Sequence, residues 1–266
     1  MSLPADFRSA SDEAWARVRV APGFLTEREA RFLALAAACT PGQGVILEIG
    51  SFKGKSTVGL ASIAARYRLG KVVAVDPHTA PSSTDPGLGD QVSSFEDFQH
   101  TLARAGLTDH VEVHRKFSHQ LATDWNRRIR LLWIDGDHTY AGAKQDLDLF
   151  APHLVPGGVV ALHDVLHNFA GPIRVFVEDV LGSDRYGPAG CCGSIGWAQY
   201  RPADGGSARF GAARRALARR ATRLIRLSER GRELRGVAKL RYKLQRALVP
   251  HGDVDPDAWA ELTADH

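Results

Sequence analysis

Short apolar runs alternate along the chain with longer stretches in which apolar residues recur every three or four positions. The runs are bounded by glycine, proline or aspartate and rich in Val, Ile and Leu, which predicts buried strands. They cover 45–49, 71–76, 111–115, 130–135, 159–164 and 194–200. Strands that alternate with helices predict the α/β class, with an open and mostly parallel sheet.

The stretches between these runs carry the signals of helices. Thr26-Glu27-Arg28-Glu29 has the spacing of a capping box, which predicts a helix from there to about Cys39. Further helices are expected after Gly54, from Phe95 to Gly106, from Tyr140 to Leu154 and from Gly171 to Leu181.

The turn after the first strand, Gly50 to Ser56, predicts a ligand site, and three ligands compete for it. A P-loop needs four residues between its glycines, but only three separate Gly50 from Gly54. A dinucleotide fingerprint needs a glycine where Phe52 stands. S-adenosylmethionine (SAM) has no phosphate, and the Glu48 carboxylate suits a cationic ligand, so the loop favours SAM.

Polar residues stand at the ends of the predicted strands. Asp76 ends the second strand, where a carboxylate bonds ribose hydroxyls in related folds, although it could simply begin a loop. The carboxyl ends of parallel strands meet at one edge of the sheet, so these residues are expected to gather there. They are Gly50, Asp76, Ser118, Asp135, His163 and Asp164. The Pro-, Ser- and Gly-rich stretch from His78 to Ser94 is predicted to form a lid or a substrate wall.

Several of these motifs together resemble the class I SAM-dependent methyltransferases. The motifs are Leu47-Glu48-Ile49-Gly50-Ser51, Val75-Asp76, the D-G-D-H-x-Y run from Asp135 to Tyr140, Pro156-Gly157-Gly158 and His163-Asp164-Val165. The resemblance covers about residues 20–200 and is greatest to the group with cephalosporin-hydroxylase-like and sugar O-methyltransferases. It implies a Rossmann-like, seven-stranded, mostly parallel sheet of order 3-2-1-4-5-7-6 with helices on both faces.

The resemblance also implies a set of site residues. Those expected around SAM are Glu48, Gly50, Ser51, Ser56, Asp76, Ser118, His119 and Asp135. A divalent metal, Mg²⁺ by its preference for carboxylates and water, is expected on Asp135, His163 and Asp164. Relatives carry an acid where His163 stands, and imidazole suits Mn²⁺, Fe²⁺ or Zn²⁺ better. The alternative is that His163 only holds its loop.

Methyl transfer to a hydroxyl requires that the acceptor lose its proton. His138 is the expected general base, because imidazole titrates near ~6.5 and is largely neutral at neutral pH. Asp137 is the second candidate, and the alternative for His138 is a cap on its own helix. The expected function is O-methylation of a sugar, polysaccharide or glycosylated natural product. A phenolic or catechol acceptor, a P-loop-like kinase or NTPase, and a nucleoside-binding module without activity are the alternatives.

The composition of the chain indicates the class of protein and its compartment. Hydrophobic content of 44% and charged content of 24% are ordinary for a globular protein, and three cysteines make no disulfide framework. The sequence has no signal-peptide pattern and no long apolar run, so a cytoplasmic protein is expected.

The net charge of +4 hides a strongly basic segment. From Arg209 to Arg246 there are fourteen Lys and Arg residues against Glu229 and Glu233. Leucines at helical spacing within this segment predict one or two amphipathic helices, broken at Gly231 or Gly236.

We therefore divide the chain into a SAM-dependent domain at 1–205 and a basic helical extension at 206–266. The extension is expected to pack on the body or on a second copy of the chain in a homo-oligomer. Peripheral contact with a membrane is the alternative, and nucleic acid is the least favoured partner.

Overall fold

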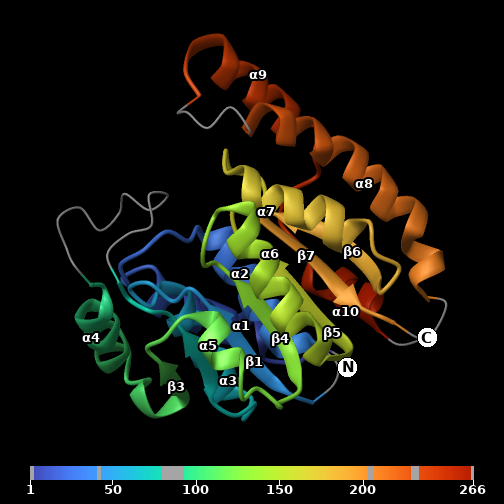
Figure 1. Ribbon diagram of the computed structural model, residues 1–266. Coiled ribbons are helices and arrows are strands. Elements are labelled where there is room, and N and C mark those ends of the chain that lie inside the picture. Colours follow the sequence, from blue (N-terminus) through green and yellow to red (C-terminus); the bar gives the residue numbers. More distant parts are fainter. Residues whose placement is uncertain (1–2, 41–42, 80–92, 203–205, 229–233, 265–266) are drawn as a thin grey trace.

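The computed structural model describes residues 3–40, 43–79, 93–202, 206–228 and 234–264 of the chain. Its centre is a seven-stranded sheet of order β3-β2-β1-β4-β5-β7-β6 (Figure 1). The strands are β1 (Val45–Ile49), β2 (Val72–Val75), β3 (Val111–His114), β4 (Ile129–Ile134), β5 (Leu154–Leu162), β6 (Tyr186–Cys192) and β7 (Ile195–Tyr200). The predicted α/β class and strand order are confirmed.

Strand pairing divides the sheet into a parallel part and an antiparallel end. β1 to β5 pair only in parallel with one another, while β7 pairs antiparallel with both β5 and β6. The apolar pattern did not predict β6, because Gly187, Pro188 and Gly190 give it the composition of a turn. Proline is tolerated in a strand at the edge of a sheet, and β6 is such a strand.

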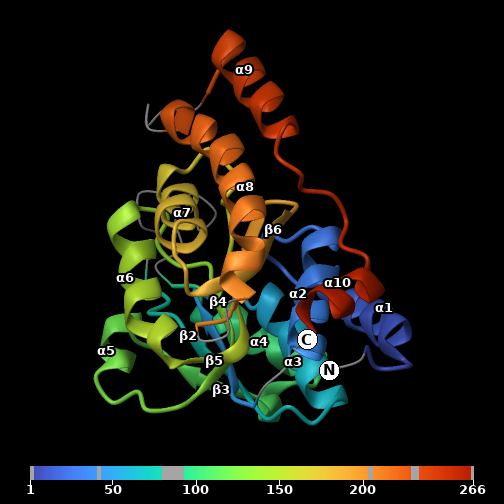
Figure 2. The ribbon, with the colours of Figure 1, turned by 90° about the vertical axis from the view of Figure 1, so that its right-hand side faces the viewer.

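Helices cover both faces of the sheet (Figures 1 and 2). One layer is formed by α1 (Phe7–Val18), α2 (Glu27–Cys39), α3 (Lys55–Arg66), α4 (Phe95–Ala105) and α10 (Pro256–Thr263). The opposite layer is formed by α5 (Ser118–Ala122), α6 (Tyr140–Phe150), α7 (Ala170–Val175) and α8 (Gly206–Ser228). The remaining helices are α9 (Gly236–Ala247), the single 3₁₀ turns η2 (Thr108–His110) and η3 (Ala151–His153), and the π-helical continuation of α7, η4 (Phe176–Leu181). The expected capping box at Thr26 is present at the start of α2.

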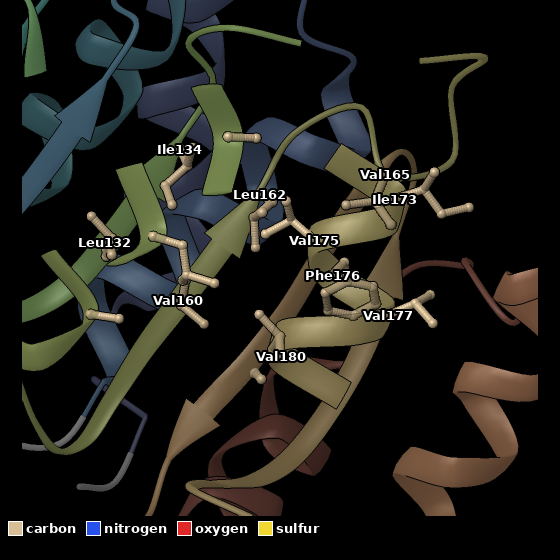
Figure 3. Packing of buried hydrophobic residues seen from close by; sticks show 14 of the residues in the cluster. Leu132, Ile134, Val160, Leu162, Val165, Ile173, Val175, Phe176, Val177 and Val180 are labelled. Atoms are coloured by element: carbon tan, nitrogen blue, oxygen red, sulfur yellow. The ribbon is translucent and has the colours of Figure 1, made fainter. Parts of the chain in front are cut away.

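Side chains of the central strands alternate between the two layers. On β4, Leu131 and Trp133 pack toward the α1–α3 layer, whereas Leu132 and Ile134 pack toward the α6–α7 layer. Figure 3 shows the second set beside Val160 and Leu162 of β5, against apolar side chains of α7 and η4. Both faces are therefore buried, which explains why these strands are continuous apolar runs.

The C-terminal segment first leaves the body and then returns to it. α8 packs one side on β6 and α7, and α9 extends beyond the sheet at the top of Figure 1. The chain then comes back, and Trp259 of α10 is buried against Phe32 and Trp197. The predicted extension at 206–266 thus contributes its last part to the core of the preceding domain. Among the described residues, no helix is long and apolar enough to cross a membrane.

Candidate functional site

The turn between β1 and α3 is tied to the end of β2 by one carboxylate. Asp76 Oδ2 accepts hydrogen bonds from the backbone N–H groups of Ser51 and Phe52, both at 2.8 Å. Its other oxygen accepts one from His78 N at 2.6 Å. Gly50 has φ +85°, and a Cβ there would fall against the backbone of Asp135. The turn can therefore be formed only with glycine at position 50.

These contacts exclude the P-loop alternative. The amides of Ser51 and Phe52, which would have to hold a phosphate, are already bonded to the Asp76 carboxylate. Lys55 Nζ donates to Ala21 O at 2.8 Å, away from the turn, instead of toward a nucleotide. The turn is thus built around an internal carboxylate and repels phosphate rather than binding it.

Glu48 lies beneath this turn rather than in a cavity wall. Its side chain is fully buried, and it accepts hydrogen bonds from Ser56 Oγ at 2.5 Å and Thr57 Oγ1 at 2.6 Å. Burial raises the pKa of Glu48 to about 7, against the lowering effect of the two hydroxyl groups. The structure thus brings Glu48 and Ser56 together as an anchor for the start of α3, and Glu48 lines neither cavity described below.

A cavity of about 270 Å³ opens at the carboxyl ends of β1, β2 and β4. Five of the residues expected around SAM lie in its wall: Gly50, Asp76, Ser118, His119 and Asp135. The rest of the wall includes Ile49, Phe52, Val75, Pro77, Thr79, Ser94, Phe117, Gly136, Asp137, Gly142, Gln145 and Asp146. We call this space the larger cavity. Residues 80–92, most of the stretch expected to form a lid, lie outside the described residues.

The far wall of the larger cavity is formed by the start of α5 and by α6. Ser118 Oγ donates to Asp146 Oδ1 at 2.5 Å, which joins the two helices. Burial raises the pKa of Asp146 to about 6, despite this hydrogen bond. His119 is exposed and stacks on Phe117, with ring centroids 5.5 Å apart. The Phe117–His119 pair presents a flat aromatic surface at the mouth of the cavity.

A second, smaller cavity of about 90 Å³ shares a wall with the first. Gly50, Phe52, Asp135 and Gly136 line both spaces, so the Asp135-Gly136 peptide lies between them. Ser51, Ser56, His138, His163 and Asp164 line only the smaller cavity, together with Gly23, Phe24, Leu25, Lys53 and Lys55. The predicted residues therefore gather at one edge of the sheet, but in two adjoining spaces.

Two carboxylates and one imidazole converge in the smaller cavity. Asp135, His138 and Asp164 each offer one ligand atom, and these atoms lie within 4.8 Å of one another. His138 Nε2 is 3.2 Å from Asp164 Oδ2, and its ring stacks on Phe169 with centroids 4.3 Å apart. Asp164 has φ +54°, a conformation that few non-glycine residues adopt, and it turns the chain directly after β5.

His163 lies beside this cluster as a buried cation. Its Nδ1 is 2.9 Å from Asp135 Oδ1 and 3.7 Å from Asp164 Oδ1. Burial opposes protonation, but the charges of Asp135 and Asp164 outweigh it and hold the pKa of His163 well above its usual value. A protonated imidazole has no free lone pair for a metal. The geometry adds His138 to the two carboxylates as a potential ligand, and it places the expected His163 within 3.7 Å of both of them.

Glu29 is the site residue that the sequence did not reveal. Its Oε2 lies 3.8 Å from His163 Nε2, and its Oε1 accepts hydrogen bonds from Ser194 N and Oγ, both at 2.7 Å. Burial raises the pKa of Glu29, but His163 and Ser194 overcome this and lower it. In the sequence, Glu29 already has a role as the last residue of the capping box. No sequence pattern therefore indicated its second contact, with His163 and Ser194.

The two candidates for the general base face different spaces. Asp137 is exposed, lines only the larger cavity and accepts a hydrogen bond from Thr139 N at 2.8 Å. His138 lines only the smaller cavity, beside Asp164. Neither ring nitrogen of His138 has a hydrogen bond with proper geometry within the described chain, although both are buried. Asp137 thus supports the loop, while His138 keeps its ring available.

The donor set of the smaller cavity fits a divalent cation. Asp135 and Asp164 supply carboxylate oxygens, which Mg²⁺ prefers, and His138 adds an imidazole whose buried nitrogens lack proper hydrogen bonds. Burial raises the pKa of Asp135, and the Asp164 charge adds to this, while His163 opposes it. A cation between the two carboxylates would relieve their mutual repulsion.

A family comparison agrees with this geometry. Residues 47–165, from β1 to the loop after β5, match a family described as a methyltransferase domain. Residues 47–165 are thus similar to a methyltransferase domain. The matched segment contains the β1 turn, Asp76, the run from Asp135 to Tyr140 and the His163-Asp164 pair.

Solved structures share the fold of this chain at low sequence identity. An O-methyltransferase from Bacillus cereus in complex with SAH is 21% identical, with 74% of this chain and 92% of that chain covered and a TM-score of 0.50. The O-methyltransferase TomG from Streptomyces achromogenes, in complex with SAM, is 19% identical over 75% of this chain and 91% of that chain, with a TM-score of 0.53. Cofactor-bound Rv0187 from MTB is 22% identical over 74% and 88% of the two chains, with a TM-score of 0.52.

Proposed function

We propose that this chain is a SAM-dependent methyltransferase, which transfers the methyl group of SAM to a hydroxyl oxygen, with a sugar or a glycosylated product as the acceptor. The donor would lie in the larger cavity and the acceptor hydroxyl in the smaller one. The observation that carries the proposal is the Asp135-Gly136 peptide, which lines both cavities beside the Asp135, His138 and Asp164 cluster.

In this reaction the acceptor oxygen displaces the sulfur of SAM from the methyl carbon. The sulfonium becomes the neutral thioether of SAH, and the hydroxyl proton must leave. We assign that proton to His138. Asp164, 3.2 Å from Nε2, would orient the ring and stabilise the imidazolium that forms. Stacking on Phe169 keeps the ring from rotating.

Asp135 and Asp164 are the residues that would hold a divalent metal, Mg²⁺ or, with His138 as third ligand, Mn²⁺. When bound there, such an ion would lower the pKa of the acceptor hydroxyl. The cation His163 and the carboxylate of Glu29 would hold Asp135 and Asp164 in place from the opposite side.

The proposal is tested by transfer of radiolabelled methyl from SAM, with and without EDTA, alongside calorimetry of SAM and SAH binding. Asp135→Asn is expected to reduce turnover by at least ~10²-fold while SAM affinity changes much less, because the amide cannot replace the charge at the acceptor. Asp124→Asn, at an exposed residue that lines neither cavity, is the matched control and should keep turnover within about threefold. Equal turnover for Asp135→Asn and the wild type would contradict the proposal.

The role of His138 is separable from that of the metal. For a general base, His138→Ala lowers the rate and removes the acidic limb of the pH–rate profile, while Mn²⁺ or Mg²⁺ affinity stays unchanged. For a metal ligand, the same variant lowers metal affinity by about 10–100-fold, as measured by calorimetry of the metal alone.

A phenolic acceptor is the second candidate, and one contact favours it. Phe24, which is 72% exposed, lies nearly parallel to Phe52, with ring centroids 6.4 Å apart and an interplanar angle of 16°. Both side chains line the smaller cavity. A flat aromatic ring, or the apolar face of a sugar, could stack on them. Competing saccharide and catechol acceptors in one assay would decide between the two classes.

A further inference from the structure

α8 and α9 carry a charge that the proposed reaction does not use. α8 contains seven arginines and α9 contains four lysines and arginines, and neither helix contains an acidic residue. Leu217, Leu224 and Leu227 bury one side of α8 in the core, so most of its arginines are left on the opposite side. α9 and the adjoining end of α8 extend beyond the sheet at the top of Figure 1.

Four arginines line a groove between these two helices. The groove has a volume of about 530 Å³ and is lined by Arg219, Thr222, Arg223, Arg226, Leu227, Arg241 and Gln245. Within the described residues, none of the four guanidinium groups has an ion pair with a carboxylate. Like charges repel when they are gathered without counter-charge, so the groove is suited to an anionic partner.

An apolar stripe runs along α9 next to this groove. Val237, Leu240, Leu244 and Leu248 are 82%, 58%, 60% and 53% exposed, and their spacing places them on one side of the helix. Arg241 follows Leu240 on the groove side, and Lys243 precedes Leu244 on the other. The stripe is therefore bordered by cations on both sides.

We propose that α8 and α9 form a docking surface for an anionic lipid bilayer. The leucine stripe of α9 would enter the boundary between headgroups and acyl chains, and the arginine groove would bind lipid phosphates. Apolar residues on one side of a helix, bordered by Lys and Arg, are what an interfacial helix requires. A nucleic acid would also complement the positive charge of the groove. It would not explain the four exposed aliphatic side chains of the α9 stripe.

The surface is connected to the site by α9. Tyr242 is buried on the side of α9 away from the stripe, and its hydroxyl donates to His167 O. His167 stacks on Phe169, which in turn stacks on His138. Docking would therefore bring the smaller cavity close to the bilayer, and its acceptor would be a lipid-anchored molecule. That consequence rests on the proposed function, whereas the docking itself does not.

The test is co-sedimentation of the full chain with vesicles of phosphatidylcholine alone or mixed with phosphatidylglycerol. Binding is expected only to the anionic vesicles and should weaken with added salt. Arg223→Glu with Arg226→Glu should lower the affinity by at least about tenfold, since each basic residue near the surface adds to the attraction of anionic lipids. Leu240→Ser with Leu244→Ser should also lower it, in this case without changing the salt dependence.

Matched controls lie on other surfaces of the molecule. Lys71→Glu with Arg104→Glu repeats the charge change, and Val20→Ser, at a residue that is 63% exposed, repeats the loss of an apolar side chain. Both should bind like the wild type, and far-ultraviolet circular dichroism should confirm that every variant is folded.

Three results would overturn the proposal. The first is equal binding to both kinds of vesicle, or to neither. The second is a stable dimer in light scattering that the α9 variants convert to monomer, which would mean that a second copy covers the stripe. The third is tighter binding to duplex RNA than to anionic vesicles. None of these measurements uses methyl transfer, so a failure here leaves the proposed function standing.

Discussion

The carboxyl edge of the sheet and the α8–α9 surface both contain many charged groups, but they differ in where those charges lie. At the sheet edge, His163 is buried among Glu29, Asp135 and Asp164. On α8 and α9 most of the arginines are exposed, Arg214 being buried, and neither helix contains a carboxylate side chain. The first arrangement fixes the position of each charge, while the second leaves the charges available to a partner.

The energetic reason for this difference is solvation. A buried charge that loses its partner cannot be compensated by water, so removing one member of such a group is costly. An exposed charge keeps most of its hydration, and its removal changes stability little. Substitutions in the two regions should therefore separate stability from binding.

The largest effect on stability is expected for His163→Leu. Leucine fills much of the space, but it leaves three carboxylates facing one another without a cation, which costs about 3–5 kcal/mol. The free energy of unfolding from urea titration at neutral pH measures this cost. A loss below about 1 kcal/mol would mean that His163 is neutral and that the charge pairing described here is absent.

His119→Leu is the control for this substitution. His119 lines the larger cavity, is exposed and touches no carboxylate among its described contacts. Its removal should change the free energy of unfolding by less than about 0.5 kcal/mol. The difference between the two histidines measures how much of the effect comes from buried charge.

A smaller, pH-dependent effect is expected for Glu48→Gln. The pKa of Glu48 is about 7 in the folded chain against 4.5 for the free group, so folding favours the neutral form. The stability that this group contributes is present below pH 4.5 and is lost as the pH rises through about 7. Above about pH 7, the wild type with a charged Glu48 is about 3 kcal/mol less stable than a protein with an uncharged group at this position.

Glutamine stays neutral at every pH and can still exchange hydrogen bonds with Ser56 and Thr57. Relative to the wild type, Glu48→Gln should leave the free energy of unfolding nearly unchanged near pH 4.5 and should increase it at pH 8. Urea titrations of both proteins across this range measure the difference. A difference that stays constant with pH would show that Glu48 is not the group that titrates.

The sequence predicted the parallel part of the fold better than its edge. The apolar runs of β1, β4 and β5 are buried on both faces, so their pattern reflects only burial. β6 is an edge strand containing Pro188, and tertiary pairing with β7 overrides its turn-like composition. The return of α10 to the core depends on contacts of Trp259 with residues that are distant in sequence.

The site was predicted as a set of residues but not as an arrangement. Position at the strand ends was enough to gather Gly50, Asp76, Asp135 and Asp164 at one edge. Both His138 and His163 lie beside the two carboxylates, an arrangement that depends on side-chain directions and that the strand pattern does not contain. Asp135 and Asp164 are the main causes of the raised pKa of His163, and Glu29, from another element of the chain, adds to them.

The smallest stability change is expected on α8, and it tests most directly whether the exposed charges of α8 and α9 serve binding rather than stability. Arg223→Glu with Arg226→Glu should alter the free energy of unfolding by less than about 0.5 kcal/mol, because both side chains are exposed and substitutions at such sites are usually tolerated. The sign should be toward stabilisation, since two charges are reversed in a groove whose charged lining residues are all arginines. Urea titration measures it on the same protein that is used with vesicles. A folded, fully stable variant that no longer binds anionic vesicles would assign the charge of this region to a partner rather than to the fold, whereas a loss above about 2 kcal/mol would assign it to the fold.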